Sequence, residues 1–161
     1  RRARDRVQEA GGGEGARVCH RGAAVKVYIA GASQEIERAE RAIHLARVAA
    51  FEIAFDWPAQ VREVGDANPA DASDGQRRAW ADALLTGVDG CHAFWLLAPA
   101  APTIGAWIEF GRALARGKYT LVSGRGESIF LASALESAAD DETGLAMLCA
   151  YRQRCSAGGA L

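Results

Sequence analysis

Short apolar runs alternate with amphipathic segments along the middle of the chain. The run from Val25 to Gly31 is rich in β-branched and aromatic residues and ends at a glycine, which is typical of a buried strand in a parallel sheet. Similar runs predict three more strands, at residues 51–57, 90–97 and 119–122. Residues 128–132 fit either a short fifth strand or the start of a helix, because a short apolar run does not distinguish the two.

Between these runs, apolar residues recur at helical spacing. The first such set contains Ile36, Ala39, Ile43, Ala46 and Ala50. The same pattern predicts three further helices, at about residues 76–86, 105–116 and 142–152, and Gly87 and Gly117 end the first two of these. Pro58 ends the second strand, and the connection from there to residue 75 exceeds the usual βα loop, so we expect a lid or a binding segment there.

Strands that alternate with helices predict parallel pairing through right-handed crossovers. The fold class is therefore α/β, with a doubly wound, flavodoxin-like and mostly parallel sheet of four to five strands flanked by helices. We expect this domain at residues 25–139, a tail at residues 1–24 and a C-terminal helix and tail at residues 140–161. Ligands of such sheets bind beyond the carboxyl ends of the strands, which gather Gly31, Asp56, Trp57 and Ser123 around one crevice.

Charge and composition narrow the class of partner. The 19 lysines and arginines against 20 acidic residues give a net charge of -1, which offers no field for a nucleic acid polymer or an anionic membrane. No apolar run approaches the roughly 20 residues that span a bilayer, and the first residues lack the apolar stretch of a signal peptide. We expect a cytoplasmic protein with a small-molecule partner.

The four cysteines, Cys19, Cys91, Cys149 and Cys155, have neither the spacing of a zinc site nor that of a disulfide framework. His44 and His92 lack ligand spacing as well, so we expect no metal. The segment after the first strand is not a Gly-x-Gly-x-x-Gly fingerprint, and no cofactor is expected.

Glu109 is the leading candidate for chemistry. It lies between Gly105 and Gly111, in the first turns of the helix that leaves the third strand. It borders an apolar stripe that we expect to pack on the sheet, formed by Ile104, Trp107, Ile108, Gly111 and Leu114. Two interpretations are open: a catalytic carboxylate at the crevice, or an exposed residue that pairs with Arg112 at i+3.

Two further residues have the same ambiguity. Asp82 on the second helix is either a catalytic acid or a solvated residue paired with Arg78 at i-4. Tyr28 on the first strand either packs in the core or brings its hydroxyl to the crevice.

These residues occur in a recognisable order. The chain carries Tyr28-Ile29-Ala30-Gly31, then Asp82, then Asp89 before the third strand, and then Gly105-x-x-x-Glu109-x-Gly111 followed by Ala113-Leu114-Ala115-x-Gly117-Lys118. Over about residues 25–139 it resembles the nucleoside 2-deoxyribosyltransferase family and its relatives, the 2'-deoxynucleoside 5'-monophosphate N-glycosidases. The resemblance implies a flavodoxin-like fold, a homodimer or higher homo-oligomer with sites near subunit interfaces, Glu109 as nucleophile and Asp82 as the acid that assists the leaving base.

The chemistry of the N-glycosidic bond agrees with these roles. Cleavage passes through an oxocarbenium-like state, so a carboxylate can trap the sugar covalently while an acid protonates the departing base. The nucleophile must be ionised and its partner protonated, which requires different environments for Glu109 and Asp82. A helix N-terminus near Glu109 favours its anion.

The candidate substrate-binding residues are Gly31, Ser33, Asp56, Trp57, Asp89, Thr103, Gly105 and Ser123. Several have an equally good structural interpretation. Ser33 and Thr103 are also candidate helix caps, Trp57 fits either base stacking or packing, and Asp89 fits a turn. The resemblance implies that Ser123 supplies a polar group to a neighbouring subunit's site.

The leading hypothesis is a hydrolase or transferase that acts on a (deoxy)nucleoside or its 5'-monophosphate through a covalent glycosyl-Glu109 intermediate. Trp107 is bulkier than expected in this segment, and it motivates an alternative, a nucleotide-binding or sensing module without turnover. A second alternative is a glycohydrolase of a larger N-glycoside such as NAD.

Overall fold

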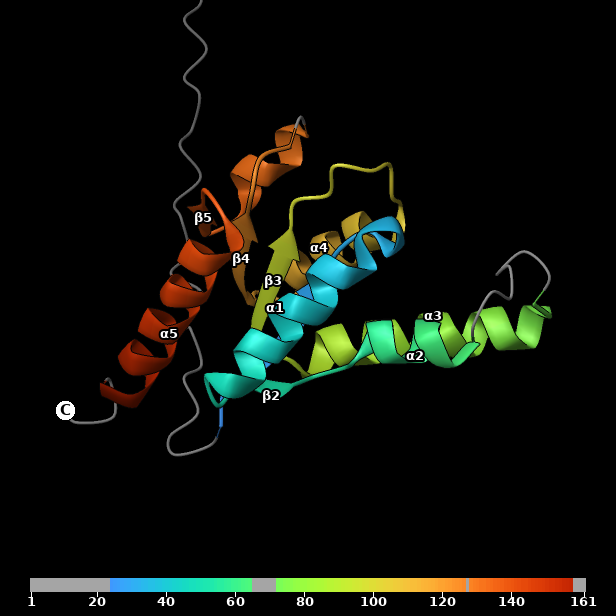
Figure 1. Ribbon diagram of the computed structural model, residues 1–161, viewed down its shortest axis with the longest axis horizontal. Coiled ribbons are helices and arrows are strands. Elements are labelled where there is room, and N and C mark those ends of the chain that lie inside the picture. Colours follow the sequence, from blue (N-terminus) through green and yellow to red (C-terminus); the bar gives the residue numbers. More distant parts are fainter. Residues whose placement is uncertain (1–23, 65–71, 127, 158–161) are drawn as a thin grey trace, which may run out of the picture.

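The computed structural model describes residues 24–64, 72–126 and 128–157, and its centre is a five-stranded sheet (Figure 1). The order is β2-β1-β3-β4-β5, and all four pairings are parallel. The strands are β1 (Lys26–Ala30), β2 (Glu52–Ile53), β3 (Ala93–Leu97), β4 (Tyr119–Ser123) and β5 (Glu136–Ala138). This order is that of a flavodoxin-like fold, so the predicted fold class is confirmed.

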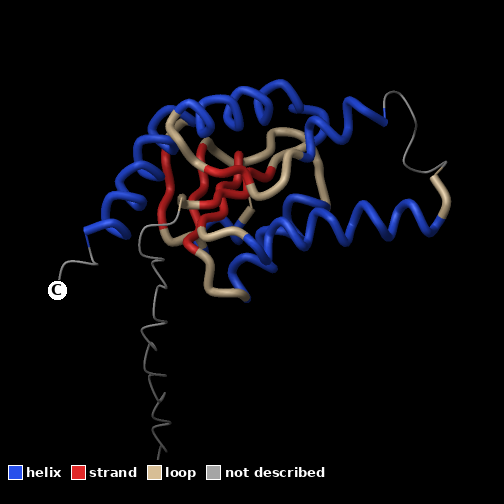
Figure 2. The backbone as a smooth tube through the Cα atoms, turned by 90° about the horizontal axis from the view of Figure 1, so that it is seen from below, coloured by secondary structure: helices blue, strands red, loops and turns tan. Residues whose placement is uncertain are grey.

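Helices cover both faces of the sheet (Figure 2). Two of them, α1 (Ile36–Val48) and α5 (Asp141–Ala157), contact each other and the sheet on one face. The other face is covered by α3 (Asp74–Gly90) and α4 (Gly105–Ala115), while α2 (Trp57–Val64) contacts α1. Among the described residues, the 3-10 helices η1 (Ser33–Glu35) and η3 (Ile129–Ser133) lie in connections.

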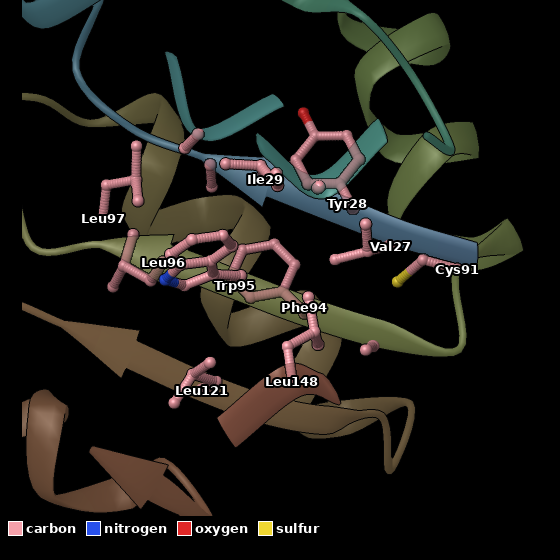
Figure 3. Packing of buried hydrophobic residues seen from close by; sticks show 14 of the residues in the cluster. Val27, Tyr28, Ile29, Cys91, Phe94, Trp95, Leu96, Leu97, Leu121 and Leu148 are labelled. Carbon is pink, nitrogen blue, oxygen red and sulfur yellow. The ribbon is translucent and has the colours of Figure 1, made fainter. Parts of the chain in front are cut away.

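The core follows from the alternation of side chains along the central strands. Every residue of β3 and of β4 is buried, as expected for strands covered on both faces. Tyr28 and its neighbour Val27 leave β1 on opposite sides (Figure 3), and the Tyr28 ring stacks on Phe94 at 5.6 Å. On the other face, Trp95 packs against α5, where a side chain on Gly144 would come within 3.0 Å of the indole.

The predicted second strand is wrong in its second half. Only Glu52 and Ile53 pair with β1, and residues 57–64 form α2 where a loop was expected. Asp56 precedes this helix, and its Oδ1 accepts the N–H of Ala59 at 3.1 Å, as an N-cap does. Pro58 is therefore a first-turn residue, where its missing N–H costs no hydrogen bond. Residues 65–71 of the expected lid lie outside the described residues.

Gly87 is not the end of its helix, because α3 continues to Gly90 and includes Asp89. A capping box between Ser73 and Gln76 fixes the start of this helix. Gly87 faces the core, and a Cβ there would lie 2.7 Å from the Cβ of Phe55 and 3.0 Å from the Tyr28 ring. The glycine is thus explained by close packing of α3 on β1.

The chain after β4 resolves the ambiguous segment. Residues 129–133 form η3, and the fifth strand comes later, at β5. The terminal helix is longer than predicted, and Leu148, Tyr151 and Cys155 bury one side of it against the sheet. Residues 1–23 of the predicted tail lie outside the described residues. Among the described helices, none has the length and apolar character of a membrane span.

Candidate active site

Glu109 lies on the buried side of α4. Its exposed fraction is 7%, and it shares this side with Ala106, Phe110 and Ala113. The predicted apolar stripe is therefore wrong, because Ile104 and Ile108 are exposed. The face of the helix that meets the sheet carries two alanines, Ala106 and Ala113, which permit close packing.

The Glu109 carboxyl faces the hydroxyl of Tyr28. Tyr28 is fully buried, and its Oη has no hydrogen-bond partner within the described part of the chain. Burial raises the pKa of Tyr28, and the nearby Glu109 carboxylate raises it further. The Tyr28 hydroxyl and the Glu109 carboxyl are thus close enough to change each other's pKa.

Burial raises the pKa of Glu109 to about 7, and the Tyr28 hydroxyl opposes this shift. The expectation that the helix N-terminus favours the anion is wrong in its net result, because desolvation dominates. No lysine or arginine in the described ranges pairs with Glu109, so the Tyr28 hydroxyl opposes the effect of burial without help from a cation. A carboxyl with this pKa changes its ionisation near neutral pH.

Aromatic rings form the floor beneath this pair. Phe94 stacks on Tyr28, and Phe110 lies 6.1 Å from Phe94. Trp107 meets the ring of Phe110 edge-on at 6.3 Å, so its bulk is used in packing. These apolar groups exclude water from the Glu109 carboxyl, which is the physical cause of its raised pKa.

Asp82 is not joined to this pair by any described contact. It is exposed on α3, and no hydrogen bond or ion pair links it to another residue that the structure describes. The first half of α3 is exposed and extends away from the sheet (Figure 1). The structure therefore brings Tyr28 and Glu109 together and leaves Asp82 in solvent.

Asp56, Trp57 and Gly31 surround the end of β1. Asp56 binds Arg47 at 2.6 Å and caps α2. Trp57 is buried, and its Nε1 donates to the carbonyl of Ile29 at 2.9 Å. A Cβ on Gly31 would meet Leu97 and Trp57 at ordinary contact distances. The indole thus has a structural contact on its polar edge.

Three candidate substrate-binding residues, Ser33, Thr103 and Gly105, make few of the described contacts. Ser33 is exposed within η1, whose cap is Ala32 without a side-chain bond, so Ser33 is not a cap. Thr103 is half-buried in the loop before α4, whose cap is Ile104, and Thr103 does not cap it. Gly105 is the exposed first residue of α4, with open space around it.

Ser123 is held within a polar network. Its Oγ accepts from Nε1 of Trp95 at 2.9 Å and donates to Oδ1 of Asp141 at 2.5 Å. Asp141 in turn accepts two hydrogen bonds from Arg38, from Nε and Nη2, each at 2.8 Å. This fork fixes α1 to α5 beside the carboxyl end of β4.

Asp89 lies near the end of α3. Arg112 binds it through two nitrogens, at 2.8 and 2.5 Å, and Arg116 lies 3.2 Å away. These partners lower the pKa of Asp89 to about 2. The i+3 partner foreseen for Glu109 thus binds Asp89. Where the structure describes the chain, no group of three or more histidines, cysteines or acidic residues could hold a metal.

Three residues of this region were missed at the level of sequence. The sequence pattern indicates a helix stop at Gly87, and it assigns no role to Arg38 or Asp141. Asp141 lies 103 residues from Arg38, so no local spacing relates the two. Only Gly87 had a signal in the sequence. A glycine that is followed by an apolar residue, here Val88, can lie on the buried side of a helix that continues beyond it.

The strand order and the helices on both faces define a flavodoxin-like α/β domain, with a buried Tyr28–Glu109 pair over one face. Among solved structures, the fold is similar to that of the CMP N-glycosidase BcmB of Clostridium botulinum, with a TM-score of 0.52 and 18% sequence identity. The match covers 78% of this chain and 99% of that one. No family model and no curated protein matches the sequence.

Proposed function

We propose that this protein cleaves the N-glycosidic bond of a (deoxy)nucleoside or nucleoside 5'-monophosphate through Glu109. The observation that carries the proposal is the Glu109 carboxyl, buried beside the Tyr28 hydroxyl and without a cation among the described residues. An ion pair would neutralise such a group, whereas this one remains available to a positive charge that develops on a substrate. The fold similarity to a CMP N-glycosidase supports the same class of reaction.

In this mechanism the ionised Glu109 attacks C1' of the sugar. A bond forms between a carboxylate oxygen and C1' as the bond from C1' to the base nitrogen breaks, and the base leaves with the electron pair. Tyr28 donates its hydroxyl proton in a hydrogen bond to the Glu109 anion, which fits the lowering effect of Tyr28 on the pKa of Glu109. Water then releases the sugar in a hydrolase, or a second base accepts it in a transferase.

The acid that protonates the leaving base is assigned to Asp82. It lies on α3, five residues before the Gly87 that packs on Tyr28, which corresponds to about 7.5 Å along the helix axis and about 140° around it, so the assignment rests on the motif order. Its exposure supports access to a substrate that covers the Glu109 carboxyl. The proposal includes distant membership of the nucleoside 2-deoxyribosyltransferase family. It rests on the order of motifs from Tyr28 to Lys118 in the sequence.

A homodimer or higher homo-oligomer is part of the proposal. Ile104 and Ile108 on α4 are 78% and 57% exposed, and neighbouring α3 presents Trp80 half-buried. Two exposed isoleucines on one helix favour an interface. Light scattering after size exclusion measures the mass, and a monomer at all concentrations would contradict this part of the proposal.

The activity is tested with a panel of nucleosides and 5'-monophosphates, including CMP and dCMP, with free base followed by chromatography. We expect base release by the wild type and none above background by Glu109→Ala. A mass increase of one glycosyl unit on the intact wild-type protein, absent from Glu109→Ala, would identify the covalent intermediate. Release that survives Glu109→Ala rules the assignment out.

A further inference from the structure

The loop of residues 98–104 connects the end of β3 to the helix that carries Glu109. Pro99 and Pro102 have no N–H, which limits the hydrogen bonds that the loop itself can make. Its first residue, Ala98, still follows the sheet and donates to the carbonyl of Ser123 at 2.8 Å. Beyond the Ala98 N–H, side chains from outside the loop supply the hydrogen bonds that hold its backbone.

Two side chains at the start of α1 tether this loop. Oε2 of Glu35 accepts the backbone N–H of Ala100 at 3.0 Å. Nη1 of Arg38 donates to the carbonyl of Ala98 at 2.9 Å, and Glu35 and Arg38 approach each other to 3.5 Å. Glu35 thus binds a backbone N–H of the loop, and Arg38, three residues later, binds a backbone carbonyl of the same loop.

The tether is itself rigid. Arg38 is fixed by the two hydrogen bonds to Asp141, and its Nη2 lies 3.4 Å from the carbonyl oxygen of Ser123. Gly124, at φ +88°, brings its backbone close to the guanidinium, and a Cβ there would lie 3.0 Å from Nη2. A planar guanidinium with five directed N–H groups keeps such a geometry better than an ammonium would.

We propose that Glu35 and Arg38 are positioning residues for substrate binding, acting through the loop of residues 98–104. The inference rests on the proposed function. Glu109 itself is held by the packing of α4 on the sheet, through Ala106, Phe110 and Ala113. The loop leaves the carboxyl end of β3, the edge of the sheet at which ligands of such folds bind, so loosening the loop is expected to change its contacts with a bound substrate. The Glu109–Tyr28 pair stays in place, so KM changes while kcat does not.

The test uses three variants, two at Glu35, the residue before α1, and one within α1. Glu35→Ala removes the acceptor of the Ala100 N–H, and Glu35→Gln keeps an oxygen at the same distance. The control is Glu40→Ala, which breaks an exposed ion pair between Glu40 of α1 and Arg62 of α2 and does not touch the loop. We expect Glu35→Ala to raise KM about tenfold, with kcat within about twofold, and to speed amide hydrogen exchange at Ala100 about tenfold. Glu35→Gln restores both values, and Glu40→Ala changes neither.

Arg38→Lys provides the matching test for the second residue. It keeps the charge but loses the fork, so KM is expected to rise while the Tyr28–Glu109 pair, and with it the pH profile of kcat, stays unchanged. A shift of that profile, or a KM equal to that of the wild type, would show that Arg38 does not act through the loop.

The inference and the proposed function fail separately. If Glu35→Ala speeds exchange at Ala100 but leaves KM at the wild-type value, the tether exists without positioning substrate, and the inference is overturned. If the wild type releases no base, the proposed function fails, and CMP affinity measured by thermal shift decides the inference. Equal affinities of wild type and Glu35→Ala for CMP then overturn it as well.

Discussion

Asp89 and Glu109 lie on the neighbouring helices α3 and α4, yet they occupy opposite electrostatic environments. Asp89 is partly exposed and is bound by Arg112 and Arg116, and its pKa is lowered to about 2, chiefly by the hydrogen bonds from Arg112. Glu109 is buried without a described cation, and burial raises its pKa to about 7. The first carboxylate is neutralised by its partners, whereas the second has no cation beside it in the described chain.

A second pair shows that a buried tyrosine beside a carboxylate does not by itself make this environment. Tyr119 is also buried with an unpartnered hydroxyl in the described chain, and Glu136 beside it raises the pKa of Tyr119 further, after burial. Here, however, Arg154 binds Glu136 at 2.8 Å. The distinguishing feature of the Tyr28 pair is therefore the missing cation, which makes Tyr119 a matched control.

The largest expected difference between the two carboxylates is in catalysis. Glu109→Gln is expected to lower kcat for base release about a thousandfold or more, because an amide neither attacks C1' nor balances the charge of the oxocarbenium. Asp89→Asn is expected to keep kcat, since Asp89 binds arginines. Steady-state kinetics on both purified variants check this, and an equal loss in the two would remove the functional contrast.

Stability against pH is the next largest effect, and its sign differs between the two sites. The folded pKa of Glu109, about 7, lies above its usual 4.5, so folding favours the protonated form, and stability falls as pH rises from about 4.5 to about 7. At about 1.4 kcal/mol per pKa unit, Glu109→Gln is expected to raise the free energy of unfolding at pH 8 by about 3 kcal/mol, and to have little effect at pH 4.

For Asp89 the sign is opposite. Its folded pKa lies below the usual 3.8, so its contribution is present above about pH 4 and is lost as pH falls towards 2. Asp89→Asn is therefore expected to destabilise the fold at pH 7. Urea denaturation of both variants at pH 4 and pH 8 measures these differences, and a change of the same sign at both sites contradicts the comparison.

Gly87→Ala is expected to have an intermediate effect. Its Cβ would lie 2.7 Å from the Cβ of Phe55 and 3.0 Å from the Tyr28 ring, so α3 or the ring must shift, at about 2 kcal/mol. The shift moves the hydroxyl relative to Glu109, and kcat falls together with the unfolding midpoint. Gly90→Ala, on the same helix with open space around it, is the control, and equal effects of the two would exclude a role for close packing.

The sequence predicts the central strands β1, β3 and β4 well, because each is a short apolar run that is followed by a helical pattern or a turn. It predicts Glu109 through the flanking glycines, although it places this residue beside the buried face of α4 and not within it. The apolar residues of this helix cover more than half of its circumference, so periodicity does not select one face within that arc. The helix at Trp57–Val64 was missed because Pro58 ends a strand as readily as it begins a helix.

The network around Arg38 has a different origin. Its partner Asp141 is 103 residues distant, and the two meet only because α1 and α5 cover the same face of the sheet. The sequence shows that Arg38 and Asp141 carry opposite charges, but it does not show that the two side chains lie close together in space. Features set by local pattern are therefore predictable here, whereas those set by tertiary packing, including the raised pKa of Glu109, require the structure.

The smallest expected effect separates the two tyrosines. The Tyr28 hydroxyl lowers the pKa of Glu109, so Tyr28→Phe removes this effect and moves the acidic limb of the kcat profile to higher pH, by up to about one pH unit. Tyr119→Phe is expected to leave the limb unchanged, because that hydroxyl faces Glu136. Each substitution deletes one buried hydroxyl and keeps the packed ring, so neither is expected to lower stability much. The two variants thus differ in catalysis while matching in folding. A limb that moves equally in both, or towards lower pH in Tyr28→Phe, would show that the hydroxyl does not stabilise the Glu109 anion.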